Sequence, residues 1–247
     1  MLVSAVMITG KNSSRKNLAR AAIRCFKEQS YKESELIIVN TGEEFGHELK
    51  YPVSSARIRE VLIANDRRLT LGDLRNIGLK MAEGDLIIQW DDDDWYSSER
   101  IETQIAALQD AEAVLLKRQV RCTIISGVAY EYRRDAGIHG TILHRNIDRL
   151  EYPSAWRGED SALIKSFRHV KVIDCNAMTY IRFFHGTNTW DEYHIMGGLS
   201  GSALVDRSST ACDEARALDQ ILLAYYPEYA MSLGRLTEGS FIKWYRR

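Results

Sequence analysis

The chain lacks the features that mark several large classes of protein. Its 247 residues include only three prolines, and no proline- or glycine-rich linker, repeat or low-complexity stretch divides the sequence. No stretch approaches the length of a transmembrane helix. The apolar start, residues 1–8, has no basic leader, so we expect a first strand there and not a signal peptide. One compact domain is the simplest expectation.

Cysteine and net charge are also low. The four cysteines lie far apart, without the paired spacing of zinc or redox sites, and predict reduced core thiols of a cytosolic protein: Cys25, Cys122, Cys175 and Cys212. The 33 basic and 34 acidic residues nearly cancel, which leaves no global field for nucleic acid or an anionic membrane. We expect a cytoplasmic location, with membrane association at most peripheral, at the inner face of the membrane.

Strands and helices alternate in the first half of the chain. β-Forming apolar runs predict strands at 3–8, 35–39, 57–63 and 86–90. Helices are predicted from a cap at 12–14 to about 29, from an Asp73 cap to Gly84, and from a Ser97 or Ser98 cap to about 108. Alternation of this kind predicts a parallel sheet with right-handed crossovers, typical of a nucleotide-binding half.

The second half is richer in strands and less regular. Strands of a mixed sheet are predicted at 113–116, 120–125, 128–133, 141–144, 170–173 and 178–183, and helices at 161–167 and 213–226. Residues 197–201 predict a flexible loop, and residues 241–247 predict the end of a helix packed on the domain. The expected fold class is α/β.

Four consecutive aspartates, residues 91–94, carry the strongest functional signal. They follow the apolar run 86–90, so a buried strand should deliver them to the carboxyl edge of the sheet, where ligands bind in open α/β folds. Adjacent carboxylates repel one another unless cations or hydrogen-bond donors neutralise them. Oxygen-only clusters suit magnesium or manganese, which also hold substrate phosphates. The pattern therefore indicates a metal and phosphate site.

Several ordered motifs, spanning about residues 3–190, resemble those of the family-2 glycosyltransferases of the GT-A fold. The similar segments are the opening strand 3–9, the second strand and turn 36–42, the Gly-x-x-x-Arg-Asn-x-Gly-like stretch 72–78, the DxD-like 91–93, the Glu-Asp pair 159–160 and the HGxNTW-like 185–190. The resemblance implies a Rossmann-like nucleotide-binding half with a mixed central sheet and a more β-rich acceptor half. A single domain, 1–247, would comprise a nucleotide-sugar half (1–96), an acceptor half (97–195) and a C-terminal extension (196–247).

The resemblance also assigns roles at the donor site. Donor-binding residues would be Thr9, Asn40, Arg75, Asp91 and Asp92. The implied metal, Mn²⁺ or Mg²⁺, would be held by Asp93, by Asp91 through water, and by His185. Arg75 would add a fixed cation near the diphosphate, while Asp92 and Asp94 support the turn; a surface salt bridge is the alternative for Arg75.

An inverting transfer needs one base to take the proton of the acceptor hydroxyl. By motif match this base is Asp160, which could also serve as the N-cap of the helix that follows. Residues implied to bind the acceptor are Glu159, Trp95, Asn188 and Trp190, of which the last two could instead pin their own loop.

Two departures from the family pattern concern the base of the nucleotide. Gly10 follows the first strand where members often carry an aromatic residue, and Asn40-Thr41 replaces the usual Asp-Asp turn. Because the Asn side chain both donates and accepts hydrogen bonds, its base preference is open, and a UDP-sugar is the default expectation.

The sequence thus predicts a metal-dependent inverting glycosyltransferase that moves a sugar from a nucleotide-diphosphate donor to a hydroxyl acceptor. A glycan or lipid-linked glycan acceptor, in polysaccharide biosynthesis, would follow from the family alone. Alternatives are a non-catalytic nucleotide-sugar-binding homologue, a nucleotidyltransferase, although residues 8–12 lack its glycine-rich loop, and a calcium-binding protein, although an EF-hand spacing is missing.

Overall fold

The structure is a computed structural model that describes residues 1–10, 13–46, 49, 57–64, 68–148, 150–195, 208–209, 213–233 and 242–245. Its contacts form two compact units. Unit 1 comprises residues 1–117 and 134–175, and unit 2 comprises residues 118–133 and 176–247. The predicted Gly-rich loop 197–201 and Cys212 lie outside the described residues.

Unit 1 holds the alternating elements that the sequence predicts. In chain order they are β1 (Val3–Thr9), α1 (Ser13–Lys27), β2 (Ser34–Asn40), β3 (Arg57–Leu62), α2 (Leu71–Met81), β4 (Leu86–Gln89), β5 (Trp95–Tyr96), α3 (Arg100–Leu108), α4 (Glu159–Ile164) and β8 (Val170–Ile173). Two long strands, β6 (Ala113–Thr123) and β7 (Val128–Arg145), contribute residues to both units.

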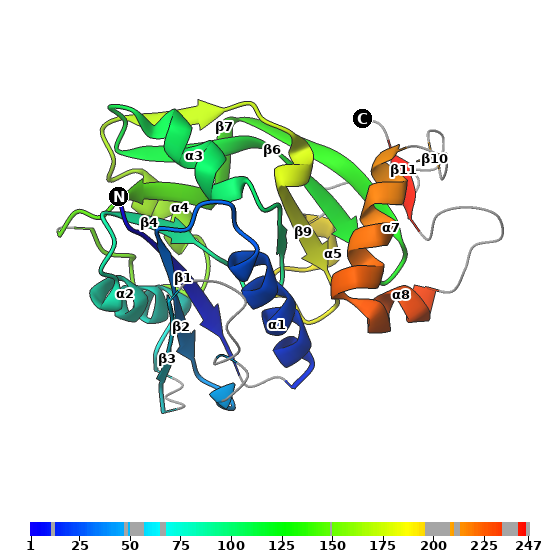
Figure 1. Ribbon diagram of the computed structural model, residues 1–247, viewed down its shortest axis with the longest axis horizontal. Coiled ribbons are helices and arrows are strands. Elements are labelled where there is room, and N and C mark those ends of the chain that lie inside the picture. The colour runs from blue at the N-terminus through cyan, green and yellow to red at the C-terminus, as the bar shows by residue number, and fades with distance from the viewer. Residues whose placement is uncertain are drawn as a thin grey trace. The chain divides into compact units, whose positions relative to one another are not determined.

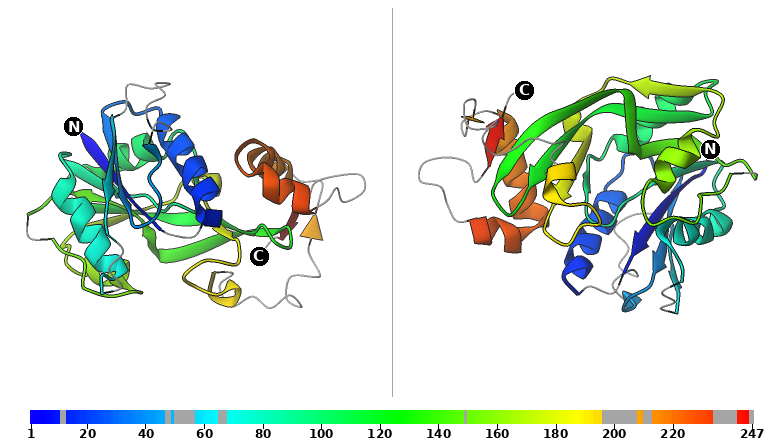
Figure 2. Two further views of the ribbon diagram at one scale, coloured as in Figure 1. Left: turned by 90° about the horizontal axis from the view of Figure 1, so that it is seen from below. Right: turned by 180° about the vertical axis from the view of Figure 1, so that it is seen from behind.

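The sheet of unit 1 is mixed. β1 pairs in parallel with β2 and β4, and β2 pairs in parallel with β3, which confirms the predicted parallel half. β7 pairs antiparallel with β4, and β8 pairs in parallel with β6. The strand order is β3-β2-β1-β4-β7-β6. Figures 1 and 2 show α1 and α2 on opposite faces of the parallel strands. The α/β class is confirmed.

Unit 2 is built on the remaining halves of β6 and β7. Its other described elements are the 3-10 helix η2 (Ala177–Thr179), β9 (Tyr180–Phe184), α5 (Glu192–Ile195), β10 (Ser208–Ser209), α7 (Asp213–Tyr225), α8 (Pro227–Leu233) and β11 (Lys243–Tyr245). β9 pairs in parallel with β6, and β11 pairs in parallel with β7 and antiparallel with β10. The predicted helix end at 241–247 is therefore wrong, because residues 243–245 form a strand.

Four predicted strands are in fact two. Residues 113–116 and 120–123 belong to one strand, β6, which ends two residues before the predicted 125, and residues 128–133 and 141–144 belong to β7. The polar stretches that suggested breaks stay in the ladder because their charges are paired: Lys117 lies 3.0 Å from Asp135, and Arg118 lies 3.4 Å from Glu131. A strand with one face exposed to solvent can therefore continue through a polar stretch of sequence.

Three helix starts differ from their predictions. α2 begins at Leu71, where Thr70 is the N-cap and Asp73 closes a capping box as the third helical residue. α3 follows Glu99, which makes no side-chain capping bond, so neither predicted serine is its cap. α4 begins at Glu159, after Gly158 in a left-handed conformation with φ of 76°, so Asp160 lies inside the helix and is not its N-cap.

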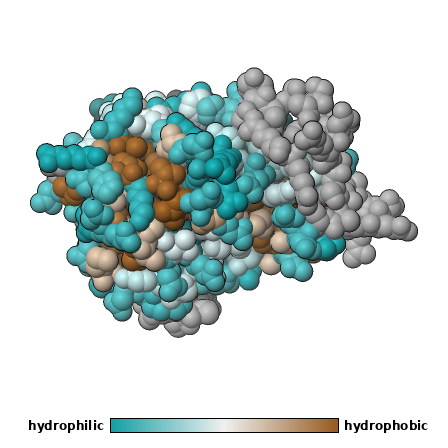
Figure 3. All heavy atoms as spheres, turned by 90° about the horizontal axis from the view of Figure 1, so that it is seen from above, coloured by the Kyte–Doolittle hydropathy of each residue, from teal (hydrophilic) through white to brown (hydrophobic). Residues whose placement is uncertain are grey.

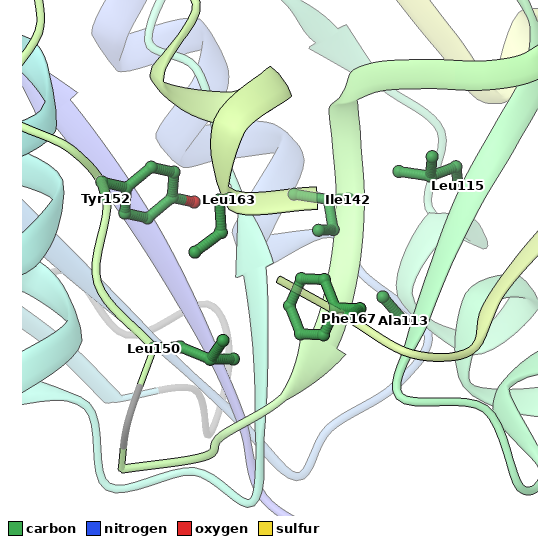
Figure 4. Packing of buried hydrophobic residues seen from close by; sticks show 7 residues of the cluster. All are labelled: Ala113, Leu115, Ile142, Leu150, Tyr152, Leu163 and Phe167. Carbon is green, nitrogen blue, oxygen red and sulfur yellow. The ribbon is translucent and has the colours of Figure 1, made fainter. Parts of the chain in front are cut away.

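A hydrophobic cluster holds α4 against the sheet in unit 1. Figure 4 shows its residues converging from β6, β7 and the segment 150–167: Ala113, Leu115, Ile142, Leu150, Tyr152, Leu163 and Phe167. Leu163, from α4, is almost completely buried there. Burial of one such side chain is worth about 1.5–3 kcal/mol, so the cluster fixes the helix that carries Glu159 and Asp160.

The described residues on the face shown in Figure 3 are mainly hydrophilic. Seen from above, one hydrophobic area lies among hydrophilic residues (Figure 3). Large exposed apolar side chains in the described ranges are scattered along the sequence: Met1, Leu62, Met81, Ile125, Trp156, Leu223 and Met231. Singly exposed apolar residues are normal in globular proteins, so these carry no functional conclusion.

Candidate active site

The polar residues of the predicted donor site lie where the parallel strands end. Thr9 and Asn40 are the last residues of β1 and β2 and lie opposite one another. β4 ends at Gln89, and the N–H of Trp90 still donates to the carbonyl of Val6, at 3.0 Å. The aspartate run therefore starts at the carboxyl edge of the sheet, which is the usual ligand edge of such folds.

Buried aromatic and cationic side chains fix the backbone of the acidic turn. The Tyr96 hydroxyl accepts a hydrogen bond from the N–H of Asp91, at 2.7 Å, and donates to the carbonyl of Asp91, at 2.9 Å. Arg100, fully buried, donates to the carbonyl of Gln89 and lies 4.4 Å from the Tyr96 ring. The indole N–H of Trp90 donates to a carbonyl of α1. Asp91 is thus held in place before any ligand binds.

Arg75 joins the two acidic motifs of unit 1. Its Nη2 donates to Asp91 Oδ1 at 3.0 Å, and its Nε donates to Glu159 Oε1 at 3.2 Å. The Arg75 side chain is 5% exposed and lies 5.7 Å from the ring centroid of Tyr152. Burial lowers the pKa of Arg75, but the attraction of Asp91 and its neighbours outweighs it and raises this pKa above its ordinary value. Burial raises the pKa of Glu159, and Arg75 partly opposes that shift. The alternative of a surface salt bridge is wrong, because this arginine is buried.

A second arginine, which the sequence analysis did not identify, neutralises the rest of the run. Arg15, from α1, is bonded to Asp92 and lies 3.0 Å from Asp93 Oδ2. Asp92 is 2% exposed, and burial raises its pKa, while Arg15 and a hydrogen bond from Thr9 oppose the shift. Asp93 is more open, with 13% of its side chain exposed. Asp91 is more open still, with 28% of its side chain exposed, so buried Asp92 and Asp94 alternate with partly exposed Asp91 and Asp93.

The segment that leads into α4 is fastened to α2. The Asn76 side chain donates to the carbonyl of Tyr152, at 2.8 Å, and accepts from its N–H, at 2.7 Å. The N–H of Gly72 donates to the carbonyl of Ala155, at 3.0 Å. A Cβ on Gly72 would lie 1.9 Å from the carbonyl oxygen of Pro153, so only glycine permits this approach. The Gly-x-x-x-Arg-Asn-x-Gly-like stretch thus positions the Glu-Asp pair.

Glu159 and Asp160 differ in environment although they are adjacent. Glu159 is 4% exposed and is engaged by Arg75, whereas Asp160 is only partly buried. Asp160 Oδ1 accepts hydrogen bonds from the N–H of Ser161, at 2.6 Å, and from its hydroxyl, at 3.2 Å. The Ser161 hydroxyl also lies 2.6 Å from Nδ1 of His139, on β7. Asp160 is therefore the more solvent-accessible member of the pair.

The Asn40 side chain forms hydrogen bonds within its own turn and with β3. Its amide group donates to the carbonyl of Glu43, at 2.8 Å, and to Glu60 Oε1, at 2.7 Å, while its Oδ1 accepts from the N–H of Gly42. The side chain is 1% exposed. Both N–H donors are used inside the protein, so the side chain could offer a nucleotide only its oxygen.

The remaining predicted residues are placed as follows. Trp95 lies in β5 and is partly buried. His185, Asn188 and Trp190 lie in unit 2, which is described separately from the aspartates, so their participation in the site stays a prediction. Asn188 Oδ1 accepts from the N–H of His185, at 2.9 Å, and its amide donates to a carbonyl of β9. Trp190 stacks on His194 with ring centroids 3.9 Å apart. These contacts favour the loop-pinning alternative for Asn188.

Arg15, Tyr96 and His139 are the residues near the motifs that the sequence analysis missed. Tyr96 lies two residues after the last aspartate, Asp94, and could have been suspected from that position. Arg15 and His139 carry no local signal, since Arg15 is 77 residues from Asp92 and His139 is 22 residues from Ser161. Only the sheet brings each to its partner.

The donor set fits a divalent metal only in part. Within the part of the chain that the structure describes, no group of three or more His, Cys, Asp or Glu side chains could hold a metal ion alone. Mg²⁺ and Mn²⁺, however, are often held by one or two carboxylates together with substrate phosphates and water. Asp93, with Asp91 nearby in the turn, supplies hard oxygen ligands of this kind. The ion pair between Arg15 and Asp93 would have to break for Asp93 to bind the cation.

Comparison with known proteins identifies the family. The sequence profile of glycosyl transferase family 2 matches residues 5–190. The chain belongs to glycosyltransferase family 2. No curated protein matches it in sequence.

Solved structures show the same fold. The chain is similar to S. aureus TarS 1–349 in complex with UDP-GlcNAc, with a TM-score of 0.57 and 13% identity over 94% of this chain and 70% of that one. It is also similar to the mannosyltransferase PcManGT from Pyrobaculum calidifontis in complex with GDP-Man and Mn²⁺, with a TM-score of 0.50 and 13% identity over 72% of this chain and 56% of that one. These likenesses confirm the GT-A fold.

The chain is shorter than these proteins. Against S. aureus TarS, with a TM-score of 0.51 and 16% identity, the match covers 91% of this chain but 43% of that one. In the described ranges, no helix is long and apolar enough to cross a bilayer.

Proposed function

We propose that this glycosyltransferase transfers a sugar, with inversion and with a divalent metal, from a nucleotide-diphosphate donor to a hydroxyl acceptor. The observation that carries the proposal is the double contact of Arg75. Arg75 ties Asp91 of the acidic turn, 16 residues away in sequence, to Glu159, the neighbour of Asp160, 84 residues away. Donor-binding and proton-accepting motifs thus meet within unit 1.

The donor diphosphate would lie at the carboxyl ends of β1 and β4. Asp93, with Asp91 through water, would hold Mn²⁺ or Mg²⁺, and His185 is the proposed third ligand. A bound divalent cation stabilises the negative charge that grows on a diphosphate leaving group. Arg75 keeps Asp91 oriented and leaves a buried positive charge at the same edge. Asp92, paired with Arg15, supports the turn from behind.

Asp160 would act as the base. As the acceptor oxygen attacks the anomeric carbon, its proton passes to Asp160, and the bond from that carbon to the diphosphate breaks. Two hydrogen bonds from Ser161 orient the Asp160 carboxylate. Glu159 is already engaged by Arg75, so it suits acceptor binding or support better than proton transfer. Trp95, Asn188 and Trp190 remain proposed acceptor contacts.

A UDP-sugar is the proposed donor. S. aureus TarS is described in complex with UDP-GlcNAc and PcManGT with GDP-Man, so relatives of this fold accept both kinds of base. Because the N–H groups of Asn40 are used in its own turn, selection of the base would rest on the Asn40 oxygen and on backbone groups of that turn.

The test compares Asp160→Asn with Asp110→Asn, an exposed carboxylate of the same unit. With Mn²⁺, UDP-GlcNAc or GDP-mannose, and simple glycoside acceptors, Asp160→Asn should keep donor binding and lose turnover by about 10²-fold or more. Proton NMR should show a product whose anomeric configuration is opposite to that of the donor. Near-normal turnover in Asp160→Asn would show that Asp160 is not the base. A product with the same anomeric configuration as the donor would contradict a single displacement.

A further inference from the structure

His139 lies beside the proposed base, although no motif includes it. It belongs to β7, which pairs with β4. The next residue, Gly140, approaches the acidic turn so closely that a Cβ there would lie 3.8 Å from Asp91 Oδ2. This part of β7 therefore lies next to the site within unit 1, and the partly buried imidazole of His139 is a titratable group that the proposed transfer leaves unused.

An unbroken chain of hydrogen-bonding atoms links His139 to Asp160. Nδ1 of His139 is 2.6 Å from Oγ of Ser161. That Oγ is 3.2 Å from Oδ1 of Asp160, and the Ser161 N–H donates to the same oxygen at 2.6 Å. A serine hydroxyl can donate to one neighbour and accept from the other, and it can reverse these roles by rotation. The three side chains can therefore pass a proton.

We propose that His139, through Ser161, removes the proton that Asp160 gains during sugar transfer. The inference rests on the proposed role of Asp160 as base. The protonated Asp160 carboxyl gives its proton to Ser161 Oγ, while the Ser161 hydroxyl proton moves to Nδ1 of His139. The products are an Asp160 carboxylate, an unchanged Ser161 hydroxyl and a His139 imidazolium. The imidazolium releases its Nε2 proton to water, and water-mediated transfer of the remaining proton from Nδ1 to Nε2 restores the tautomer that can accept again. Proton count and charge balance at each step, and no further reactant is needed.

The surroundings of His139 favour a short-lived imidazolium. Burial lowers the pKa of His139, the cations Arg134 and Lys165 lower it further, and the anion Asp160 opposes them. The resting imidazole is therefore neutral near pH 7 and able to accept a proton on a ring nitrogen. Once charged, it faces two cations and gives the proton up to water readily, which returns Asp160 to its basic form for the next turnover.

The experiment separates proton transfer from orientation. His139→Gln keeps a group that can bond Ser161 but cannot carry the proton, whereas His139→Ala leaves space for added imidazole. His169→Ala, at a histidine whose side chain is 54% exposed in the same unit, is the matched control. Turnover and donor binding are measured with Mn²⁺ and the nucleotide sugar that the enzyme uses, from pH 5.5 to 9.

His139→Gln and Ser161→Ala should each lower kcat by about 10²-fold, the lower end of what a positioned proton-transfer group contributes. Donor affinity should stay constant, the double variant should be no slower than the slower single variant, and imidazole should restore turnover in His139→Ala. Wild-type turnover in His139→Gln would overturn the relay. The relay would also be overturned if His139→Ala has low turnover that added imidazole does not restore, because a purely structural role of His139 would then explain the loss.

The two proposals can fail separately. Loss of turnover in Asp160→Asn together with normal turnover in both His139 variants would reject the relay and keep the base. Normal turnover in Asp160→Asn would reject both.

Discussion

Neighbouring carboxylates of one acidic run have different partners and different exposure. Asp91 faces Arg75, while Asp92 and Asp93 share Arg15. Asp92 is almost fully buried, whereas Asp93 and Asp91 are more open, with 13% and 28% of their side chains exposed. Burial therefore alternates along the acidic turn, although all four residues are aspartates.

Asp93→Asn should abolish metal-dependent donor binding and leave the fold stable. Arg15 keeps its ion pair with Asp92 when Asp93 is neutralised, and repulsion between the adjacent carboxylates falls, so the free energy of unfolding should hardly change. Isothermal titration of the variant with a UDP-sugar, with and without Mn²⁺, checks this, with Asp148→Asn as control. Unchanged affinity in the presence of Mn²⁺ would exclude Asp93 from the site.

His144 should make the protein less stable in acid. Burial lowers the pKa of His144 from 6.5 to about 4, and its Nδ1 lies 2.8 Å from the carbonyl of Arg145. Between these two pH values the unfolded chain binds a proton on this residue that the folded chain does not. The stabilisation is therefore complete above pH 6.5 and is lost as the pH falls to 4, by about 3 kcal/mol.

Urea unfolding of the wild type and of His144→Phe at pH 7, 5.5 and 4 measures this effect. Carboxylates titrate alike in both proteins, so the difference in unfolding free energy isolates His144 and should shift in favour of the variant as the pH falls. His169→Phe, at an exposed histidine, is the control. A difference that stays constant with pH would contradict the buried neutral imidazole.

Among the elements, α2 links the largest number of site features. Its first turn is closed by the Thr70–Asp73 capping box. From there Gly72 meets the 153–155 segment, Arg75 reaches both acidic motifs, and Asn76 holds Tyr152. Residues three or four apart share a helix face, so one helix can hold the acidic turn and the α4 segment together.

Gly78→Ala tests how closely α2 packs on the sheet. An added Cβ would lie 2.3 Å from Cγ1 of Val6, which is too short for any real contact, so the helix or the strand must move. We expect the free energy of unfolding to fall by about 1–3 kcal/mol, the usual cost of overpacking a core. Chemical denaturation measures it, with Lys80→Ala, on the exposed face of α2, as control. Unchanged or increased stability would show that the contact relaxes freely.

On the scale of the whole molecule, ligand binding should raise the thermal midpoint, because a ligand that binds only the folded state stabilises all of it. A nucleotide sugar at a hundred times its dissociation constant should add about 2.7 kcal/mol. A thermal-shift panel of UDP, GDP and their sugar conjugates, with and without Mn²⁺, should show metal-dependent stabilisation by one base. ATP is the control. No shift with any of them would favour a binding-incompetent homologue.

The fold could be predicted from the sequence at the level of elements and class. The strands at 3–8, 35–39 and 86–90 were predicted within one or two residues, because hydrophobic periodicity is a local property of the chain. The breaks predicted near 117–119 and 134–140 were wrong, because cross-strand charge pairs keep polar residues in β6 and β7. The roles of the site residues stay predictions, although the structure shows where each one lies.

The sequence by itself determined the α/β alternation, the acidic run behind a buried strand and the family, since all three reside in the order of side chains along the chain. Only the tertiary structure decided the partners: Arg15 with Asp92, Arg75 between Asp91 and Glu159, and His139 with Ser161. Each pairing joins residues at least 16 positions apart. Such contacts depend on how the sheet and the helices pack. No local pattern in the sequence encodes which of these side chains will pair with each other.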